Sequence, residues 1–399
     1  MAKRYKVLLV HNYYKIRGGE DTVVANEKQL LESAGHEVYT YFRRNDEIDT
    51  LPLWRKALLP LTTLFSLRTY RDICRIIREK GVDVVHVHNT LLMVSPAVYY
   101  AARRCGVPVV QTIHNFRLFC PAGTYFRDGH VCEDCRTCGL HCAVRHSCYR
   151  GSKAQSLLCA FNTWLQRRMG LWRHVHFICL TEFNKRKLLE LNEPSGRTLI
   201  TPQQVTVKPN VSVSPPAAFP AVPWQQRENT VVFAARLDET KGVRVLLEAW
   251  KQLGEDAPKL DICGEGDLRE WSESFIRENK LTCVEYSGAV PHEVMMQKTA
   301  AAKALVLPSL WYEGFPMTIA EAYAVGTPVI GSDLGNVGDL VRAGGGFVFE
   351  TGSPQSLADA VRQMQTAHAL PVRGIAGMTP QENSAALEAV YRSVISQPL

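Results

Sequence analysis

The chain has 399 residues, of which 46% are hydrophobic, and this length excludes a domain built on a single core and favours two domains. No apolar run approaches the roughly 20 residues that a membrane-spanning helix needs. Residues 1–210 hold 31 Lys and Arg against 17 Asp and Glu, whereas residues 211–399 hold 15 against 22, so the basic first half favours an anionic partner.

The first half contains three predicted strands that end in histidine. KVLLVHNYYKIRGGED places His11 at the end of an apolar run, before Gly18 and Gly19. DVVHVHN and VVQTIHNF place His86, His88 and His114 at the ends of two later strands. A strand-end histidine is most often a hydrogen-bonded structural residue, and we adopt that interpretation for His11, His86 and His88. The glycine pair lacks Cβ atoms, so the backbone there can approach a ligand closely.

Two stretches of the first half mix Leu, Phe and Trp with Arg, namely residues 54–80 and 156–177. This pattern is typical of helices that lie at a membrane interface, and an ordinary amphipathic core helix remains the alternative for each. The Met-Ala-Lys-Arg start has no apolar signal core, so we expect a cytoplasmic protein, peripheral at the inner face of the membrane. Nucleic acid is disfavoured as a partner because no aromatic platform interleaves the basic residues.

Six of the twelve cysteines lie between Cys120 and Cys148. Cys132 and Cys135 have the Cys-x2-Cys spacing of a zinc knuckle, and Cys120 and Cys148 flank them, so these four thiolates form a candidate zinc site. Cys138 and Cys142 are additional, and the sequence leaves open whether one of them replaces a ligand. A set of reduced thiols without metal is the other interpretation. Structural disulfides are disfavoured in a cytoplasmic protein.

The sequence divides after the first half. Residues 209–223 are rich in proline and uncharged, which predicts a semi-rigid linker. We expect a first domain at 1–208 with a cysteine-rich insert at 118–152, a second domain at 224–377, and a last helix at 378–399. That helix has apolar residues at helical spacing.

The second half repeats a pattern of a buried strand followed by a polar loop. VVFAARLDETKG places Arg236 and Lys241 after one strand, where ligands of α/β sheets bind, and their charges suit a diphosphate. Further junctions are LDICGEGD with Gly264, VEYSGAVPHEV with Val290, and ALVLPSLWYEGFP, which leads into EGFPMTIAE. There Pro316 suits a first helical position, and the free N–H groups of Met317 and Thr318 form an anion site.

In this order, the segments resemble the carboxyl-terminal half of the retaining GT-B glycosyltransferases of family 4, also called glycosyl transferases group 1, whose signature is the Glu313-x7-Glu321 element. EAYAVGTPVIGSDLGNVGDLV and GGGFVFE extend the resemblance, although Asn336 to Asp339 replace the family's usual acid with a shorter one. The insert resembles that of some exopolysaccharide-type members. The resemblance implies an α/β GT-B fold of two Rossmann-like domains facing across a cleft, with the last helix crossing back to the first.

The resemblance also implies roles for the candidate residues. The protein would transfer a hexose-like sugar from a UDP or GDP sugar to a glycan or lipid-diphosphate-linked saccharide in polysaccharide synthesis. No catalytic metal or other catalytic cofactor is expected. The implied catalytic residues are His114, Arg236, Lys241 and Glu313. The implied donor-binding residues are Gly18, Gly19, Arg236, Lys241, Gly264, Val290, Gly314, Phe315, Met317, Thr318 and Glu321.

Other functions remain open at this point. A nucleotide-sugar epimerase would use the same donor site differently, whereas a phosphorylase would need a pyridoxal-phosphate lysine, for which no motif is present. A zinc-dependent nucleic-acid-binding or scaffold protein would use the insert and the basic half. The four polar residues Arg236, Lys241, Glu313 and Glu321 argue against a scaffold, which has no need of them.

Overall fold

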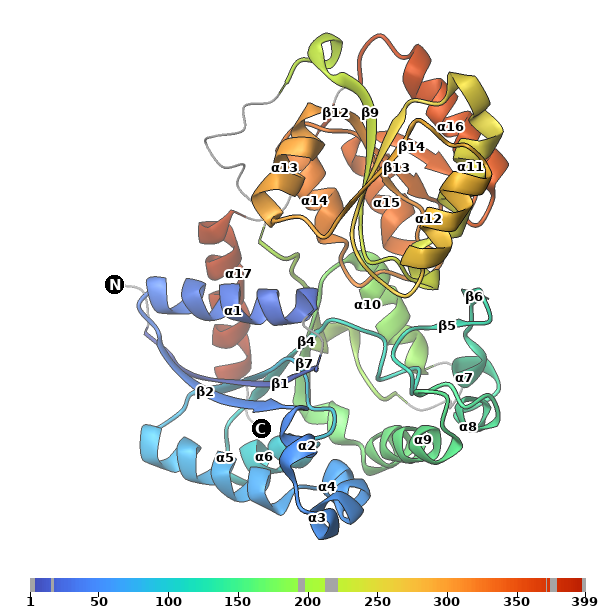
Figure 1. Ribbon diagram of the computed structural model, residues 1–399. Helices are drawn as coiled ribbons and strands as arrows, with labels where there is room; N and C mark the ends of the chain where they lie inside the picture. Colours follow the sequence, from blue (N-terminus) through green and yellow to red (C-terminus); the bar gives the residue numbers. More distant parts are fainter. Residues whose placement is uncertain are drawn as a thin grey trace. The chain divides into compact units, whose positions relative to one another are not determined.

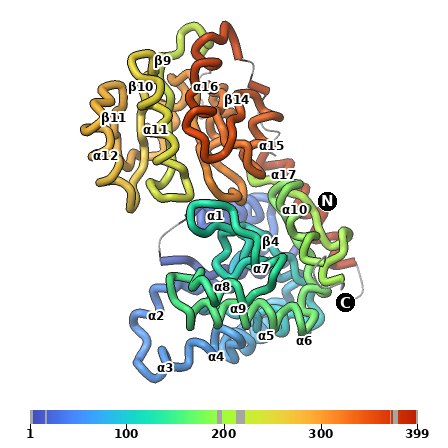
Figure 2. The backbone as a smooth tube through the Cα atoms, turned by 90° about the vertical axis from the view of Figure 1, so that its right-hand side faces the viewer, coloured from blue at the N-terminus to red at the C-terminus, as the bar shows by residue number. Residues whose placement is uncertain are grey.

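The computed structural model describes residues 4–15, 18–192, 198–211, 222–370, 372–373 and 379–396. The chain divides into two compact units, one of Met1–Gly123, Glu133–Asn210 and Pro380–Leu399, the other of Thr124–Cys132 and Val211–Thr379. Each unit is an α/β layer structure (Figures 1 and 2). Of the predicted linker at 209–223, residues 212–221 lie outside the described residues.

The described part of the first unit contains a parallel sheet with the order β2-β1-β3-β4-β7-β8. Its strands are β1 (Lys6–Tyr13), β2 (Glu37–Arg44), β3 (Val84–Val87), β4 (Val109–Ile113), β7 (Val175–Cys179) and β8 (Val205–Val207). Its helices are α1 (Gly19–Ser33), α2 (Glu47–Thr50), α3 (Leu53–Ala57), α4 (Leu59–Leu64), α5 (Leu67–Lys80), α6 (Ala97–Arg104), α7 (Asp134–Thr137), α8 (His141–Arg145), α9 (Lys153–Met169), α10 (Glu182–Leu189) and α17 (Pro380–Ile395).

Helices cover both faces of this sheet, α1 and α17 on one and α5 and α6 on the other (Figure 1). The near-continuous apolar runs of β1 and β3 are those of strands buried on both faces. Val7 and Leu9 of β1 pack in one core with Leu387 and Tyr391 of α17, so the last helix completes the core of the first unit.

The second unit contains a parallel sheet with the order β11-β10-β9-β12-β13-β14 in the described residues. Its strands are β9 (Glu228–Ala234), β10 (Lys259–Cys263), β11 (Val284–Gly288), β12 (Ala302–Leu307), β13 (Val329–Ser332) and β14 (Gly346–Phe349). Its helices are α11 (Val243–Leu253), α12 (Arg269–Glu278), α13 (His292–Ala301), α14 (Met317–Ala324), α15 (Gly335–Gly344) and α16 (Pro354–Thr366). The short antiparallel pair of β5 (Phe126–Arg127) and β6 (His130–Val131) also groups with this unit.

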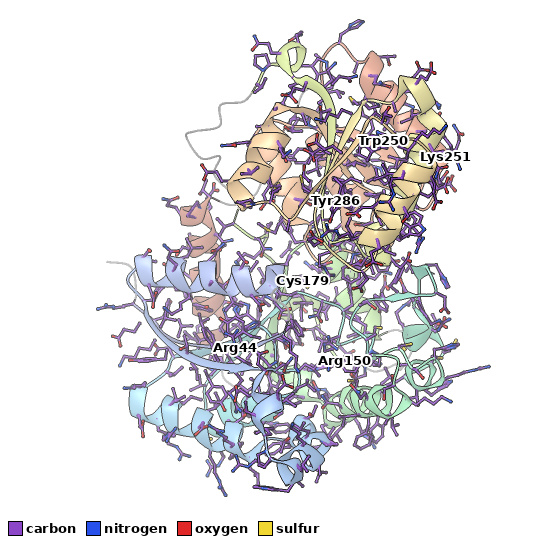
Figure 3. All side chains as sticks on the ribbon, viewed as in Figure 1. Arg44, Arg150, Cys179, Trp250, Lys251 and Tyr286 are labelled. Carbon is purple, nitrogen blue, oxygen red and sulfur yellow. The ribbon has the colours of Figure 1, made fainter. Side chains whose placement is uncertain are left out.

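Alternate residues of β9 face the two helical layers of the second unit, as the period of two along a strand requires. Val231 and Phe233 pack with α11 and α16, whereas Val232 and Ala234 pack with α13, α14 and α15. Trp250 of α11 is fully buried on the side of the sheet that α11 and α16 cover. Its indole N–H donates to the carbonyl of Pro258 at 2.9 Å (Figure 3). Two rigid layers therefore fix the position of the strand ends.

Candidate active site

The direction of the strand order changes between β9 and β12, and ligands of open α/β sheets bind beyond the carboxyl ends of strands at such a point. The predicted donor residues follow the strands that meet here. Arg236 and Lys241 come after β9, Gly264 after β10 and Glu313 after β12. The candidate donor site is therefore this edge of the second sheet.

Two glycines let the loops at this edge touch through their backbones. A Cβ on Gly264 would lie 1.9 Å from the carbonyl oxygen of Ala235, and a Cβ on Gly242 would lie 1.9 Å from that of Pro308. Gly242 also has a φ of +70°, which side chains disfavour. No other residue type fits these positions without a shift of the backbone, so the glycines hold the loops after β9, β10 and β12 together.

Lys241 and Glu313, 72 residues apart in sequence, form a largely buried ion pair. Lys241 Nζ lies 2.7 Å from Glu313 Oε1, and the Ser309 hydroxyl donates to the same oxygen at 2.6 Å. Burial alone would raise the pKa of Glu313, but the charge of Lys241 and the hydrogen bonds of Lys241 and Ser309 lower it. The carboxylate is thus ionised, and it holds the Lys241 ammonium, which also lies over the Trp311 ring at 5.3 Å.

Arg236 is placed differently from Lys241. Its side chain is 63% exposed, and its guanidinium lies 3.1 Å from the carboxylate of Asp238. An exposed pair of this kind is weak, so Arg236 can exchange Asp238 for a phosphate at little cost. Lys241 supplies a fixed charge, and Arg236 supplies a movable one.

The signature helix α14 begins at Met317, and Pro316 is its N-cap rather than its first helical residue, one position from our expectation. Pro316 is extended, with φ −74° and ψ 95°. Glu321 is buried one turn into the helix, and its Oε1 lies 3.0 Å from Nε2 of His292, whose side chain is 60% exposed. A ligand diol can therefore replace His292 as the partner of this carboxylate.

The remaining donor candidates lie around this edge with different exposures. Gly314 and Phe315, which precede α14, and Met317 and Thr318, in its first turn, are partly exposed. Val290 instead packs against the core beside β9 and α14.

Sequence reasoning missed two residues that organise this edge, Ser309 and Asn336. The Asn336 side chain is buried in α15 and donates to the carbonyls of Glu313 at 2.6 Å and Gly314 at 2.8 Å. It thereby fixes the signature loop. Ser309 directly follows an apolar strand, so the rule that found Arg236 also applies to it. Nothing in the sequence around Asn336 indicates its two carbonyl partners.

At the carboxyl edge of the first sheet, the predicted histidines surround a carboxylate that the sequence did not single out. Glu27 Oε1 lies 3.0 Å from His86 Nδ1 and 3.2 Å from His88 Nε2, and Lys208 Nζ lies 3.4 Å from Glu27 Oε2. Burial alone would raise the pKa of Glu27, but the charges of His86, Lys208 and His88 hold it well below its ordinary value.

Glu27, His86 and His88 are the group of described residues whose ligand atoms lie close enough to hold a metal ion. However, Lys208 already supplies a positive charge there. Both nitrogens of His86 are also engaged, Nδ1 by the Tyr391 hydroxyl at 2.7 Å and Nε2 by the Thr112 hydroxyl at 2.8 Å. His86 is thus hydrogen-bonded through both ring nitrogens and His88 through Nδ1, as we expected for these residues. The contact between Glu27 Oε1 and His88 Nε2 is electrostatic, because neither atom makes a hydrogen bond.

His114 joins this cluster through His88, since His88 Nδ1 and His114 Nε2 lie 2.9 Å apart. Burial lowers the pKa of both histidines, and the nearby His88 lowers that of His114 further. Glu27 Oε1 lies 3.2 Å from His88 Nε2 without the geometry of a hydrogen bond, and its negative charge favours the His88 tautomer with the proton on Nε2. In that tautomer His88 Nδ1 accepts from His114 Nε2. This leaves Nδ1 of His114 as a hydrogen-bond acceptor.

The glycine loop brings two further acids to this edge. Asp21 accepts from His11 Nε2 at 2.9 Å and from the backbone N–H of Gly18 at 3.1 Å. Burial lowers the pKa of His11 to about 4, and it raises the pKa of Glu20 to about 8, although Arg117 opposes the second shift. A Cβ on Gly18 would meet no atom within 4 Å, so the backbone there is open to a ligand. A Cβ on Gly19, which begins α1, would likewise meet no atom within 4 Å.

Of the predicted residues of the first half, the structure thus brings His11, His86, His88 and His114 into one connected group. Asp21, Glu20, Glu27 and Lys208 complete it. Nothing in the local sequence singles out Glu27, which lies in a polar stretch typical of an exposed helix face.

No disulfide links the twelve cysteines, all of which lie in the described residues. Cys135 is buried and packs with Cys142, Ala143 and Cys148. Burial, together with the neighbouring thiols of Cys120 and Cys148 and, to a smaller extent, of Cys142, raises the pKa of the Cys135 thiol to about 12. Three of the four predicted zinc ligands are therefore neighbours in the first unit.

Comparison with known proteins matches both halves of the chain to glycosyltransferase family models. Residues 216–373 match the family model of glycosyl transferases group 1, and residues 18–203 match that of the glycosyl transferase 4-like domain. A glycogen synthase of Mycobacterium tuberculosis is 27% identical over 265 residues, which cover 66% of this chain and 55% of the relative. The chain thus spans about half the length of that curated relative.

Two solved structures match nearly the whole chain. A glycosyltransferase from Rickettsia africae has a TM-score of 0.65 at 14% identity and covers 99% of both chains. The Anabaena protein HepE, in complex with UDP, has a TM-score of 0.60 at 16% identity and covers 98% of both. These likenesses confirm the predicted α/β GT-B fold. The two family matches, which together span most of the chain, show that it belongs to the glycosyltransferases, with a 4-like amino-terminal half and a group 1 carboxyl-terminal half.

Proposed function

We propose that the protein transfers a hexose from a nucleotide-diphosphate sugar to a saccharide acceptor, with retention of configuration, in polysaccharide synthesis. The observation that carries the proposal is the buried Lys241–Glu313 pair at the carboxyl edge of the second sheet. A buried carboxylate that orients an ammonium makes a fixed positive charge, which is what a departing diphosphate requires. The relative that makes glycogen supports a polysaccharide product.

In this reaction, the bond between the anomeric carbon and the diphosphate oxygen breaks, and its electron pair leaves on that oxygen. The acceptor hydroxyl oxygen forms the new bond on the same face of the sugar, and its proton passes to the diphosphate. Lys241 and Arg236 stabilise the negative charge that grows on the leaving group. These cations do the electrostatic work for which other transferases use a divalent metal, so no catalytic metal is needed.

The geometry also supports a set of further donor contacts. Glu321 accepts hydrogen bonds from the ribose hydroxyls in place of His292, and the backbone at Gly314 and Phe315 binds sugar hydroxyls. Glu313 orients Lys241. Met317 and Thr318 present the helix start to the diphosphate, and Gly264 lines the base. UDP is the first candidate for the nucleotide because HepE binds it, and GDP is the second.

The first unit is proposed to bind the acceptor, with Gly18, Gly19 and His114 near the transferred sugar. His114 Nδ1 is an acceptor, so it can receive a hydrogen bond from a sugar hydroxyl. The basic character of residues 1–210 suits a lipid-diphosphate-linked saccharide at the inner face of a membrane. None of the described helices is long and apolar enough to cross a membrane.

A thermal-shift screen with UDP, GDP, ADP and their hexose conjugates tests the donor site. We expect one nucleotide to raise the melting temperature, since a ligand at 100 times its Kd stabilises the native state by about 2.7 kcal/mol. Glu321→Ala should abolish most of this shift. Glu293→Ala removes an exposed carboxylate of α13 and serves as the matched control, which should keep it. If no nucleotide stabilises the folded wild type, the proposed nucleotide-sugar transfer is rejected and a non-enzymatic binding module is favoured.

We further propose that Cys120, Cys132, Cys135 and Cys148 bind one structural zinc ion. The clustering of Cys135 with Cys120 and Cys148 fits this group, because a zinc ion would displace the thiol protons and its charge would compensate the thiolates that remain close together. The insert has only short helices and a two-residue hairpin, so it has little core of its own. A zinc ion would supply the missing stability.

Metal analysis of protein purified without added zinc should find about one zinc per chain, as a four-thiolate site requires. Cys135→Ser should lose the metal. Cys138→Ser is the matched control, since Cys138 is exposed in the same insert, and it should retain the metal. Loss of zinc from Cys138→Ser would instead transfer a ligand position to that residue, and metal-free wild type would leave a set of reduced thiols.

A further inference from the structure

Among the residues that the structure describes, the strongly exposed large hydrophobic side chains lie on one part of the first unit. Across the described ranges, every strongly exposed residue of this kind falls between 53 and 67 or between 157 and 169. Trp54 is 61% exposed, Leu61 64% and Trp164 50%. We name this set the apolar face, and its members are Leu53, Trp54, Leu58, Leu61, Phe65, Leu67, Leu157, Phe161, Trp164 and Met169.

The two stretches of the apolar face are about a hundred residues apart in sequence, yet they meet in space. Helix α4 contacts helix α9 directly. The sequence suggested one long amphipathic stretch at 54–80, but the structure divides it. Pro60 lies in the first turn of α4, and Ser66 caps α5 by accepting from the N–H of Thr69. The short helices α3 and α4 bury none of their large apolar side chains, whereas α5 packs Ile73 and Ile77 into the core.

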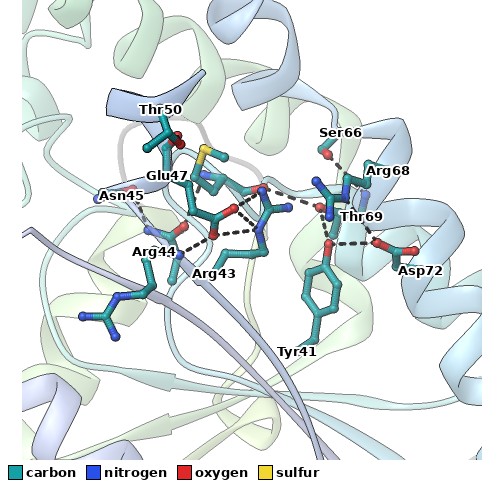
Figure 4. A network of polar contacts seen from close by, with 12 residues as sticks. Tyr41, Arg43, Arg44, Asn45, Glu47, Thr50, Ser66, Arg68, Thr69 and Asp72 are labelled. Carbon is teal, nitrogen blue, oxygen red and sulfur yellow. Dashed lines mark hydrogen bonds and ion pairs between the residues drawn. The ribbon is translucent and has the colours of Figure 1, made fainter. Parts of the chain in front are cut away.

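Polar contacts hold this segment in place (Figure 4). The Tyr41 hydroxyl on β2 donates to Thr69 on α5 at 3.3 Å. Arg43 binds Glu47 through two nitrogens at 2.7 and 2.9 Å, and the backbone N–H of Ser66 donates to Ser95 at 2.9 Å. These contacts fix α2 and the start of α5 to neighbouring elements, so the exposed side chains of the apolar face belong to an ordered part of the first unit.

Basic side chains border the apolar face. A groove next to it is lined by Phe65, Leu67, Tyr70, Tyr100, Arg103 and Arg104, and a second by Tyr70, Arg71, Cys74, Arg75, Arg78, Glu79 and Arg104. Asp72 pairs with Arg68 and Arg75. The charges of three arginines are available to an external anion, because Arg71, Arg78 and Arg104 form no ion pair with another described residue.

We propose that the apolar face and these arginines bind the surface of an anionic lipid bilayer. A contiguous exposed apolar surface marks an interaction site, and Trp, Phe and Leu beside Arg are the residues that insert at the boundary of headgroups and acyl chains. Arginines attract the anionic headgroups. A second copy of the chain is a poorer occupant, because it would bring two strongly basic surfaces together.

Vesicle flotation tests the proposal without any sugar substrate, so its result is independent of the transfer reaction. Wild type should bind vesicles of phosphatidylcholine with phosphatidylglycerol, bind pure phosphatidylcholine far less, and lose binding as salt rises. Trp54→Ser with Leu61→Ser should weaken binding by about tenfold or more, because these side chains no longer insert. Both sites are exposed, so the nucleotide-induced thermal shift should be unchanged.

Charge reversal at Arg71 and Arg78 to Glu should also weaken binding to anionic vesicles. The charge-matched control reverses Lys251 and Arg277, which are exposed on the second unit, and it should bind like wild type. The proposal is overturned if wild type ignores anionic vesicles, or if the control weakens binding as much as the arginine variant does. Sedimentation that reveals a dimer dissolved by Trp54→Ser with Leu61→Ser would assign the face to a second copy instead.

Discussion

Replacing Lys241 with methionine is expected to lower kcat/KM for sugar transfer by about 10²–10³-fold, because the change removes a cation that stabilises the leaving diphosphate. It should also lower the free energy of unfolding by about 3 kcal/mol, because Glu313 then stays buried without its ammonium partner. Ser309 still donates to the carboxylate, which keeps the loss near the lower end of the usual range. Steady-state kinetics and urea denaturation measure the two effects.

A double variant separates stability from catalysis. Lys241→Met with Glu313→Gln removes both charges, and the glutamine can still accept from Ser309. We expect it to recover stability to within about 1 kcal/mol of wild type, while transfer remains slow. If the double variant is as unstable as the single one, the ion pair is not the source of the loss. Near-normal turnover of Lys241→Met would refute the role of Lys241 at the diphosphate.

The dependence on pH has a defined sign. In wild type the pKa of Glu313 lies below its ordinary 4.5, so its stabilising contribution is present above that pH and is lost as pH falls through the lowered pKa. Without Lys241, burial dominates and raises this pKa. The carboxylate of the variant then takes up a proton on mild acidification, so its deficit relative to wild type should shrink as pH is lowered toward about 5.

Arg236→Ala provides the comparison at the same edge. Arg236 is exposed and its partner Asp238 is not deeply buried, so the free energy of unfolding should change by less than about 0.5 kcal/mol. Transfer should nevertheless slow, since the movable phosphate contact is gone. The pair of variants therefore distinguishes a fixed buried cation from an exposed one.

The second sheet could be predicted largely from local sequence, because each apolar run ends at a glycine or proline and each is followed by polar residues. Parallel strands bring such residues to one edge, which is why Lys241 and Glu313 were both identified. Their mutual contact could not be predicted, since no local pattern pairs a lysine after one strand with a glutamate after another. The contacts of Asn336 could not be predicted for the same reason, because its partners are carbonyl groups of a distant loop.

The first sheet was harder to interpret. Glu27 lies in the polar stretch NEKQ, which resembles the exposed face of a helix, and its burial arises from His86, His88 and Lys208 far along the chain. Composition did indicate the apolar stretches at 54–80 and 156–177. It could not show that α9 ends at Met169 and that a buried strand, β7, begins at Val175, so only the first part of the second stretch belongs to the apolar face.

Replacing Glu27 with glutamine is expected to be the most destabilising single change in the first unit. Lys208 is only 3% exposed, and without the carboxylate its charge keeps only the hydrogen bond to Asn383 at 3.0 Å. Breaking a buried pair in this way costs about 3–5 kcal/mol. Thermal and urea denaturation measure this loss, which should be confined to the transition of the first unit if the two units unfold separately.

The matched rescue is Glu27→Gln with Lys208→Met. It removes both buried charges, so it should recover most of the lost stability, whereas Lys208→Met alone should destabilise by leaving Glu27 uncompensated. An additive cycle, with no recovery in the double variant, would show that Glu27 and Lys208 act independently.

Glu27 is also expected to act as a positioning residue for His114. Nitrogen NMR of the histidine rings should find the His114 proton on Nε2 in wild type, because Glu27 fixes the tautomer of His88 and His88 fixes that of His114. In the rescued double variant this preference should weaken, and kcat should fall while KM for the donor stays the same. A merely structural cluster would leave both the tautomer and kcat unchanged once stability is restored.

The histidines of this cluster also set how stability responds to acid. His11, whose pKa burial lowers to about 4, is neutral when folded but takes up a proton below its ordinary 6.5 when unfolded. The unfolded chain then binds more protons at His11, and the lowered pKa values of His88 and His114 act in the same direction. Glu20 opposes them, because its folded pKa of about 8 lies above its ordinary 4.5. The free energy of unfolding should therefore fall as pH decreases from 6.5 to about 4, by less than the histidines alone would give. Glu27 adds its own loss only below its ordinary 4.5. Urea denaturation across this range should therefore show wild type and the rescued double variant losing stability in parallel above 4.5, and wild type losing more below it.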